Sequence, residues 1–200
     1  MAAVALAGSP AAQACGYHDP ASASVGMLNW AYPDALHVRT AVWMAQASGL
    51  LARREPLPDA DPLSVTFRFQ QSIRLRDAQA RLEELRGRVH TALAGQPMPA
   101  FAMVLIGPML WTRFESPEGT LNMVSHATGP ASDDVVIVTD EAVVAALADG
   151  RITARDARAQ GLVKAYGTSE SIDRVSALFD RSFESKENQM SQSQPFMKAR

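Results

Sequence analysis

The sequence predicts an α+β fold in which an antiparallel sheet is covered by helices and preceded by an N-terminal aromatic and helical appendage. Of the 200 residues, 47% are hydrophobic and 20% are charged, a balance that supports a buried core and excludes disorder throughout the chain. Four apolar runs of strand length lie between residues 101 and 139, separated by Gly and Pro. Segments with helical spacing of apolar residues lie on both sides of them.

The first segment, residues 1–14, is composed mainly of small apolar residues and ends in Ala12-Gln13-Ala14. This small-x-small pattern is typical of a signal-peptidase cleavage point. We therefore expect residues 1–14 to be the remnant of a signal peptide and the mature protein to be periplasmic or secreted. The segment has no basic residue, so a disordered Ala-rich tail is the alternative. Cys15 follows the cleavage point directly, which leaves a lipoprotein anchored through Cys15 as a further alternative, although Ala12 stands where lipoproteins usually carry Leu.

Residues 15–62 form the expected appendage. Residues 16–33 are dense in Pro, Gly and aromatic side chains, which predicts an ordered loop. A helix is expected to follow, capped by Asp34 and ended near Gly49. Its apolar face is predicted from residues that recur at intervals of three or four: Leu36, Thr40, Trp43, Ala47 and Leu50. Three prolines between residues 56 and 62 then predict a linker.

Residues 63–183 are expected to fold as one α+β unit. The alternation of Val65, Phe67 and Phe69 with polar residues favours a short strand, and a helix that continues into the next segment is the alternative. Residues 75–93 have helical spacing and predict an amphipathic helix that ends at Gly95. The four apolar runs that follow predict an antiparallel sheet, because short turns suffice to join antiparallel strands.

Capping signals predict three helices in the last part of the unit. Thr139 is expected to cap a helix that runs to Leu147, and Thr153 with Asp156 resembles a capping box for a short helix. Residues 162–166 predict a strand, and Ser169 is expected to open the last helix. The buried face of that helix is predicted from Ile172, Val175, Leu178 or Phe179, and Phe183. Residues 184–200 are polar and are expected to be disordered.

The segment from DVVIVTDEAVVAAL to GLVKAYG and the closing helix resembles the C-terminal half of sterol-carrier-protein-like domains. In that family a strand leads into an acidic-capped helix, and a Gly-containing turn, a short Ala-rich helix, a strand and a final helix follow. The resemblance covers residues 133–181 in pattern and residues 72–132 in the order of elements. It implies a sterol-carrier-like domain over residues 63–183 that encloses an apolar tunnel.

Several function classes are excluded or disfavoured by composition. The 19 Lys and Arg against 21 Asp and Glu give no positive field for nucleic acid, which is not an expected partner. A single Cys excludes an intramolecular disulfide and a zinc site built on several thiolates. No apolar run reaches the length of a transmembrane segment. The motifs G-x-S-x-G, H-E-x-x-H, G-x-G-x-x-G and the P-loop are missing, so the sequence predicts neither an enzyme nor a cofactor.

We therefore expect a non-catalytic protein that carries an apolar small molecule, a lipid or an isoprenoid such as a quinone, between the sheet and the helices. Large or flexible side chains suit such a cavity, and they suit a solid core equally well. The expected ligand-binding residues are Phe101, Met103, Leu105, Met109, Trp111, Leu121, Met123, Leu147 and Phe179.

Two other functions remain open. Cys15, His18 and Asp19 are the one cluster of candidate metal ligands, which makes a periplasmic copper-binding or redox accessory protein an alternative. A protein-interaction module is the second alternative, with a partner bound by residues 16–45 and above all by Trp30, Tyr32 and Trp43.

Overall fold

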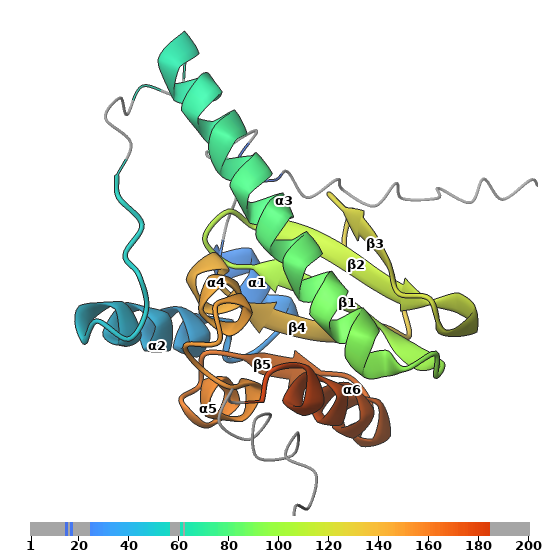
Figure 1. Cartoon of the computed structure of the whole chain (residues 1–200). Coiled ribbons are helices and arrows are strands. Elements are labelled where there is room, and N and C mark those ends of the chain that lie inside the picture. The colour runs from blue at the N-terminus through green and yellow to red at the C-terminus, as the bar shows by residue number, and fades with distance from the viewer. Residues whose placement is uncertain (1–14, 16, 18–24, 57–60, 62, 185–200) are drawn as a thin grey trace, which may run out of the picture.

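The fold is known from a computed structural model that describes residues 15, 17, 25–56, 61 and 63–184 (Figure 1). The predicted signal segment and the predicted C-terminal tail, apart from residue 184, lie outside these residues.

A five-stranded sheet with the order β3-β2-β1-β4-β5 forms the centre of the fold. The strands are β1 (Met98–Leu105), β2 (Leu110–Ser116), β3 (Asn122–Ser125), β4 (Val135–Thr139) and β5 (Lys164–Tyr166). The α+β prediction is confirmed, but the sheet is mixed and not antiparallel throughout, because β4 pairs with β1 in parallel. All five residues of β4 are buried, and a strand without a polar side belongs inside a sheet, between two neighbours.

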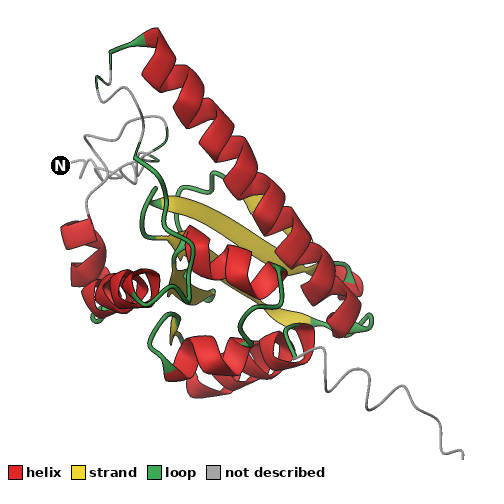
Figure 2. Cartoon of the chain, turned by 60° about the vertical axis from the view of Figure 1, so that its left-hand side comes forward, coloured by secondary structure: helices red, strands yellow, loops and turns green. Residues whose placement is uncertain are grey.

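Helices cover both faces of this sheet. On one face, α3 (Val65–Leu93) packs against α4 (Glu141–Ala148) and α6 (Ser169–Ser182), as Figures 1 and 2 show. Phe101 and Phe114 of neighbouring strands stack with ring centroids 4.6 Å apart on this side, where the Phe179 ring of α6 meets Phe101. Trp111 points to the other side, since side chains alternate along a strand, and it contacts Tyr32 of the N-terminal region.

The expected short strand at Val65, Phe67 and Phe69 is wrong, and the alternative of a continuous helix is confirmed. The helix α3 begins after Ser64, whose hydroxyl accepts a hydrogen bond from the Phe67 N–H at 3.2 Å. The helix ends at Leu93, and Ala94 and Gly95 follow with positive φ, close to the predicted end.

The N-terminal region differs from its prediction in two ways. The expected loop over residues 16–33 contains a helix, α1 (Val25–Ala31). The next helix, α2 (Ala35–Ala47), has the expected bounds, but the predicted apolar face is wrong. Its buried side consists of Ala35, Val38, Val42 and Ala45, whereas Leu36, Trp43 and Met44 are exposed. The small side chains on the buried side let α2 pack closely on the sheet. The predicted face was wrong because it was chosen from the larger apolar residues, which lie on the outer side.

Caps in the C-terminal part follow the sequence closely, with one shift. The cap of α4 is Asp140 and not Thr139, because Thr139 is buried in β4 and donates its hydroxyl proton to the Leu162 carbonyl at 3.0 Å. Thr153 accepts the predicted hydrogen bond from the Asp156 N–H at the start of α5 (Ala154–Ala159). In α6 the buried residues Val175, Leu178 and Phe179 confirm the expected face.

The described residues of the N-terminal appendage share one core with the rest of the chain. Cys15, Tyr17 and Leu28 belong to the same buried cluster as the sheet and its covering helices. The Tyr166 hydroxyl of β5 also donates a hydrogen bond to the Pro33 carbonyl. The sheet therefore holds the N-terminal helices in place.

Two glycines in different environments give a matched test of this fold. Gly119 has φ +81°, and a Cβ atom there would lie 2.2 Å from the Gly95 carbonyl oxygen. We expect Gly119→Ala to lower the free energy of unfolding by about 2–4 kcal/mol, from backbone strain and overpacking together. Gly87 lies inside α3 with no atom within 4 Å of a Cβ, so Gly87→Ala should raise stability by about 0.5–1 kcal/mol. Urea unfolding of the two variants measures both effects, and equal stabilities would contradict the contact between residues 95 and 119.

Candidate functional site

A cavity of about 300 Å³ opens between α2 and the start of α4. Its other walls are the segment at residues 52–54 and the turn between β1 and β2 at residues 106–108. The lining residues are Arg39, Val42, Trp43, Gln46, Ala52, Arg53, Arg54, Ile106, Gly107, Pro108, Asp140, Glu141, Ala142 and Ala145.

The parallel pairing of β1 and β4 brings two of these walls together. The Ile106 N–H donates a hydrogen bond to the Thr139 carbonyl at 2.8 Å, which fixes the end of β1 beside the start of α4. A Cβ atom at Gly107 would lie 3.2 Å from a carboxylate oxygen of Asp140. A larger residue at position 107 would therefore crowd this part of the wall.

Three polar side chains form a cluster beside the cavity, and two of them, Arg54 and Glu141, belong to its lining. The Tyr17 hydroxyl donates to Glu141 Oε2 at 2.7 Å and accepts from Arg54 Nη2 at 2.5 Å, and Arg54 also forms an ion pair with Glu141. Tyr17 is only 4% exposed. Burial, followed by the nearby negative charge of Glu141, raises the pKa of the Tyr17 phenol well above its ordinary value. The phenol is therefore neutral at physiological pH, and it ties residue 17 to α4.

Two further arginines, Arg39 and Arg53, add positive charge to the cavity lining. Arg39 lies 5.9 Å from the centroid of the Trp43 ring, and Arg53 Nε donates to the Gln46 carbonyl at 3.3 Å. Within the described part of the chain, neither guanidinium forms an ion pair with a carboxylate. Asp140 caps α4 through the Ala142 N–H at 3.1 Å, and so its charge lies at the helix terminus. An anion in the cavity would therefore meet two arginines that form no ion pair with the described residues, together with the carboxylate of Asp140.

Apolar surface continues from the cavity onto the outside of α2. Trp43 is 67% exposed, and Met44 is similarly accessible. A second, more open hollow is lined by Trp43, Met44, Gln46, Ala47, Arg53 and Arg54, so it shares four residues with the first. A ligand longer than the cavity could extend along this surface.

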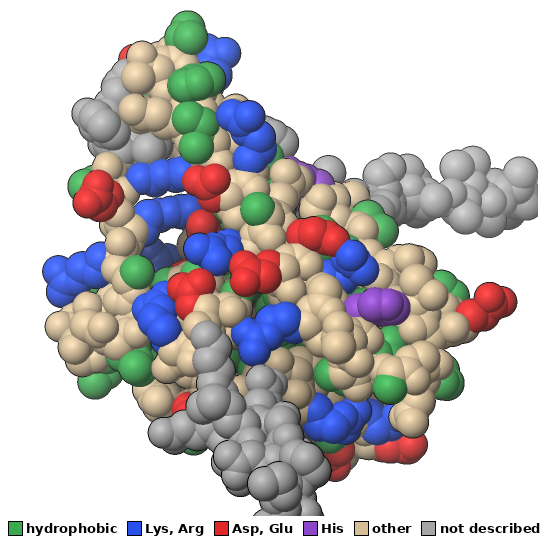
Figure 3. Space-filling model, viewed as in Figure 1, with side chains coloured by type: hydrophobic (Ala, Val, Ile, Leu, Met, Phe, Trp, Pro, Cys, Tyr) green, Lys and Arg blue, Asp and Glu red, His purple; other side chains and the backbone are tan. Residues whose placement is uncertain are grey.

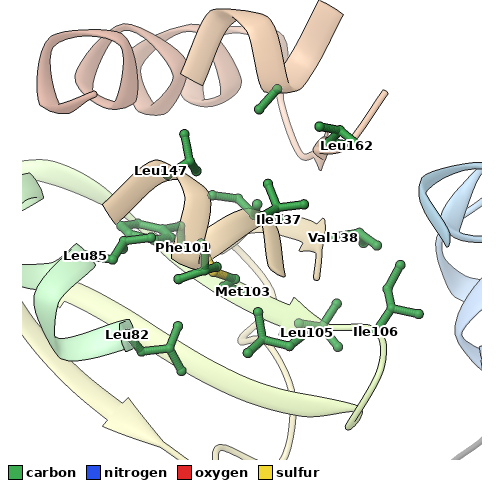
Figure 4. Close-up of a cluster of buried hydrophobic side chains, with 14 of the residues drawn as sticks. Leu82, Leu85, Phe101, Met103, Leu105, Ile106, Ile137, Val138, Leu147 and Leu162 are labelled. Atoms are coloured by element: carbon green, nitrogen blue, oxygen red, sulfur yellow. The ribbon is translucent and has the colours of Figure 1, made fainter. Parts of the chain in front are cut away.

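The nine residues expected to bind a ligand lie elsewhere. Eight of them are buried and Met123 is half-buried, and none lines the cavity. The structure also divides them between two faces of the sheet: Phe101, Met103 and Leu105 point toward α3 and α6, and Trp111 points away. The side chains shown in Figure 4 pack against one another as a hydrophobic core.

The cluster predicted as an alternative metal site is described only at Cys15. Its side chain is buried, and Cys15 Sγ lies 3.9 Å from the Pro108 carbonyl oxygen, at the cavity wall. His18 and Asp19 lie outside the described residues. Among the residues that the structure does describe, no group of three or more His, Cys, Asp or Glu side chains is arranged to hold a metal ion.

Sequence reasoning missed the arginines and acidic residues of the cavity. The adjacent residues Arg53 and Arg54 can be seen in the sequence after α2. The pairing of Arg54 with Tyr17 and Glu141 depends on tertiary structure and cannot be seen there. Trp43 was identified as a candidate partner-binding residue, and it lies at the cavity edge.

Comparison with protein-family models, curated proteins and solved structures gives no match. The resemblance of residues 133–181 to sterol-carrier-protein-like domains therefore stays a prediction. Among the helices of the described ranges, none has both the length and the hydropathy needed to cross a membrane.

The Tyr17 cluster predicts a specific pH dependence of stability. The pKa of Tyr17 is raised above 10.0 in the folded protein, so folding retains a proton that the unfolded chain loses in alkaline solution. The resulting stability is present below about pH 10 and is lost as the pH rises above that value. We expect Tyr17→Phe to cost about 1–3 kcal/mol at neutral pH, because Arg54 and Glu141 lose a buried partner.

Urea unfolding at about pH 8 and about pH 10.5 measures both parts of this prediction. The variant should lose less stability than the unmutated protein between the two pH values. Its remaining alkaline loss comes from Tyr32 and Tyr166, whose pKa values burial also raises. The same decrease in both proteins would contradict the role assigned to Tyr17.

Proposed function

We propose that the protein binds, without transforming it, a small amphipathic molecule with an apolar body and an anionic group, such as a fatty acid or an acidic isoprenoid. The observation that supports this function best is the cavity itself, which combines apolar walls with two arginines that form no ion pair among the described residues. Its volume of about 300 Å³ is at the lower end of the range for small-molecule sites. The proposal keeps a lipid or an isoprenoid as the ligand, adds an anionic group that the sequence did not predict, and moves the site to α2 and α4.

The apolar body of the ligand is assigned to the inner walls. Val42, Ile106 and Pro108 are buried side chains that offer hydrocarbon surface, and Ala142 and Ala145 leave space because they are small. Removal of a hydrocarbon chain from water supplies the main free energy of binding.

The anionic group is assigned to the cavity edge, near Arg39 and Arg53. Arg54 is not available in the same way, since its guanidinium is already paired with Glu141 and Tyr17. Guanidinium groups bind carboxylates and phosphates through two parallel hydrogen bonds, so they fix the orientation of the ligand as well as its charge.

Binding is favoured over catalysis by the way the buried polar groups are used. The hydroxyl of Tyr17 and the carboxylate of Glu141 are hydrogen-bonded within their own cluster. A general acid or base must reach the substrate, and these groups are occupied in holding the N-terminal segment to α4.

Export of the protein, predicted from residues 1–14, is part of this proposal.

A dansyl-labelled undecanoic acid tests the proposal directly. We expect a rise in dansyl fluorescence on binding, and an affinity at least about tenfold lower for the methyl ester, which lacks the charge. Arg53→Gln should weaken binding of the acid by a similar factor and leave the ester unaffected. Arg155→Gln is the matched control, since Arg155 is an exposed residue of α5 away from the cavity. Equal affinities for acid and ester would contradict the role of the arginines.

A variant that fills the cavity tests its location. Ala145 is half-buried on the cavity wall, and Ala145→Phe would place an aromatic ring in the open space. We expect this variant to unfold at a urea concentration close to that of the unmutated protein and to lose binding of the dansyl-labelled acid. Unchanged binding would move the site away from α4.

The second candidate function is docking of a protein partner on the outer face of α2. The exposure of Leu36, Trp43 and Met44, together with Trp30, which is 90% exposed, favours it, because Trp and Arg are enriched at the centres of interfaces. Extraction of the purified protein with organic solvent, followed by mass spectrometry, separates the two candidates. Recovery of an acidic lipid supports the carrier, whereas an empty extract together with no uptake of the dansyl probe favours docking.

A further inference from the structure

The lining of the cavity between α2 and α4 contains a carboxylate that is only partly used by the fold. Asp140 is half-buried and lies directly before α4. Its Oδ1 accepts the hydrogen bond from the Ala142 N–H at 3.1 Å that caps the helix. Its Oδ2 accepts no hydrogen bond from the residues that the structure describes and forms no ion pair with them. One oxygen of Asp140 therefore serves the helix, and the other remains available to a ligand.

The residue beside Oδ2 is a glycine, which leaves this oxygen accessible. A Cβ atom at Gly107 would lie 3.2 Å from Asp140 Oδ2, closer than an ordinary van der Waals contact. Gly107 does not have the left-handed backbone that favours glycine in a turn. The backbone conformation therefore does not explain the glycine, and its missing side chain provides room next to Oδ2. Both residues belong to the cavity lining, so a ligand in the cavity can approach this oxygen.

The charges of the lining favour a neutral hydrogen-bond donor over a cationic one. Three arginines and two acidic residues line the cavity, which gives one positive charge in excess. Arg54 makes no ion pair with Asp140, because its guanidinium is paired with Glu141. A single carboxylate on the ligand balances the excess charge, and an additional ammonium group would restore it. Figure 3 shows basic and acidic side chains intermixed on the face that it draws, so no broad field of one sign dominates there.

A purely apolar chain in the cavity would leave Oδ2 without a donor. An ionised carboxylate accepts hydrogen bonds at both oxygens, and water supplies those that the protein does not. A hydrocarbon chain that fills the cavity excludes this water, and the loss of donors to a charged group weakens binding. A hydroxyl group on the ligand replaces the water with a charge-assisted hydrogen bond, which is stronger than one between neutral groups.

We propose that the ligand of the cavity is a hydroxylated acid whose hydroxyl group donates a hydrogen bond to Asp140 Oδ2. This inference rests on the proposed function and specifies its ligand further. The ligand has one anionic group near Arg39 and Arg53, an apolar chain, and a hydroxyl group on that chain. Asp140 then has two roles, because one oxygen caps α4 and the other distinguishes hydroxylated from unsubstituted ligands.

The two polar groups of this ligand are separated by hydrocarbon. Arg39 lies on α2 and Arg53 follows that helix, whereas Asp140 lies on the α4 side of the cavity. Both arginines are exposed, and Asp140 is half-buried. An ω-hydroxy acid can reach both walls at once, because its hydroxyl group and its carboxylate are at opposite ends of the chain. An α-hydroxy acid places both groups on the same wall and fits this arrangement less well.

Competition with the dansyl-labelled undecanoic acid is the test. Unlabelled hexanoic, octanoic and decanoic acids are compared with their ω-hydroxy and ω-amino forms at equal chain length. For at least one chain length, we expect the ω-hydroxy acid to displace the dansyl probe at a concentration about fivefold or more below that of the unsubstituted acid. The ω-amino form should displace the probe less well than the ω-hydroxy form, since it has no net charge to balance the arginines.

Variants of the full chain locate the hydroxyl group. Asp140→Ser removes Oδ2 and retains a side chain that caps helices about as well as Asp, so urea unfolding should show a retained fold. The preference for the ω-hydroxy acid should be lost in this variant. Gly107→Ala should reduce the preference as well, because the added Cβ atom crowds Oδ2. Asp173→Ser is the matched control and should leave the preference unchanged, since Asp173 is an exposed residue of α6 that does not line the cavity.

The outcomes separate this inference from the proposed function. If the dansyl-labelled acid does not bind, the proposed function is wrong and this inference is wrong with it. If the probe binds and no ω-hydroxy acid displaces it better than the unsubstituted acid, the hydroxyl group is wrong and the proposed function stands. A preference that Asp140→Ser retains assigns the hydroxyl group to another residue and overturns the role of Asp140. Stronger displacement by an ω-amino acid overturns the inference in favour of a cationic group.

Discussion

The parallel pairing of β1 with β4 is the constraint on which the candidate site depends. In parallel strands the carboxyl ends lie at the same edge of a sheet, so the turn after β1 and the start of α4 meet there. Phe101 pairs with Val135 and Leu105 with Thr139, which sets Ile106–Pro108 beside Asp140 and Glu141. An antiparallel β4 would have placed these two segments at opposite edges. The carboxyl edge is also where open sheets of α/β proteins commonly bind ligands.

The N-terminal region completes this edge through a cluster of buried polar groups. An ion pair that loses water on burial stabilises a fold only when its remaining hydrogen-bonding capacity is satisfied. In this protein the Tyr17 hydroxyl supplies the missing partner to both Arg54 and Glu141. Tyr17 comes from one chain segment, Arg54 from the stretch after α2, and Glu141 from α4. Their mutual dependence holds α2 over the end of the sheet and thereby forms the cavity.

Local sequence signals were sufficient to predict the ends of helices wherever those ends depend on residues close by in the sequence. Thr153 caps α5 through a residue three positions away, and Gly95 follows the end of α3 with a positive φ. The direction of β4 could not be read in this way, because it depends on which edge of β1 remains free. The alternation of apolar and polar residues at 65–69 was misleading for a similar reason. Over five positions this alternation fits a strand, and it also fits a helix that carries apolar residues on its exposed outer side.

The same limit applies to the candidate site. The apolar residues chosen as ligand contacts were those that fill a core, since size and flexibility suit both roles. The residues that distinguish the cavity are Arg39 and Arg53, which line it and form no ion pair with a carboxylate of the described residues. Such a feature is a property of the folded surface, and no spacing in the sequence predicts it.

The exposed apolar side chains of the described residues are concentrated in one part of the chain. Among the described residues, nine large hydrophobic side chains are exposed, and eight of them lie between residues 30 and 73. Full burial of one such side chain is worth about 1.5–3 kcal/mol, which is large beside a total stability of about 5–15 kcal/mol. The sheet and the helices α4–α6 bury nearly all of their large hydrophobic side chains. Within the described residues, the inner side of the N-terminal half therefore completes the core, and its outer side, on α2 and on α3, carries most of the exposed large hydrophobic side chains.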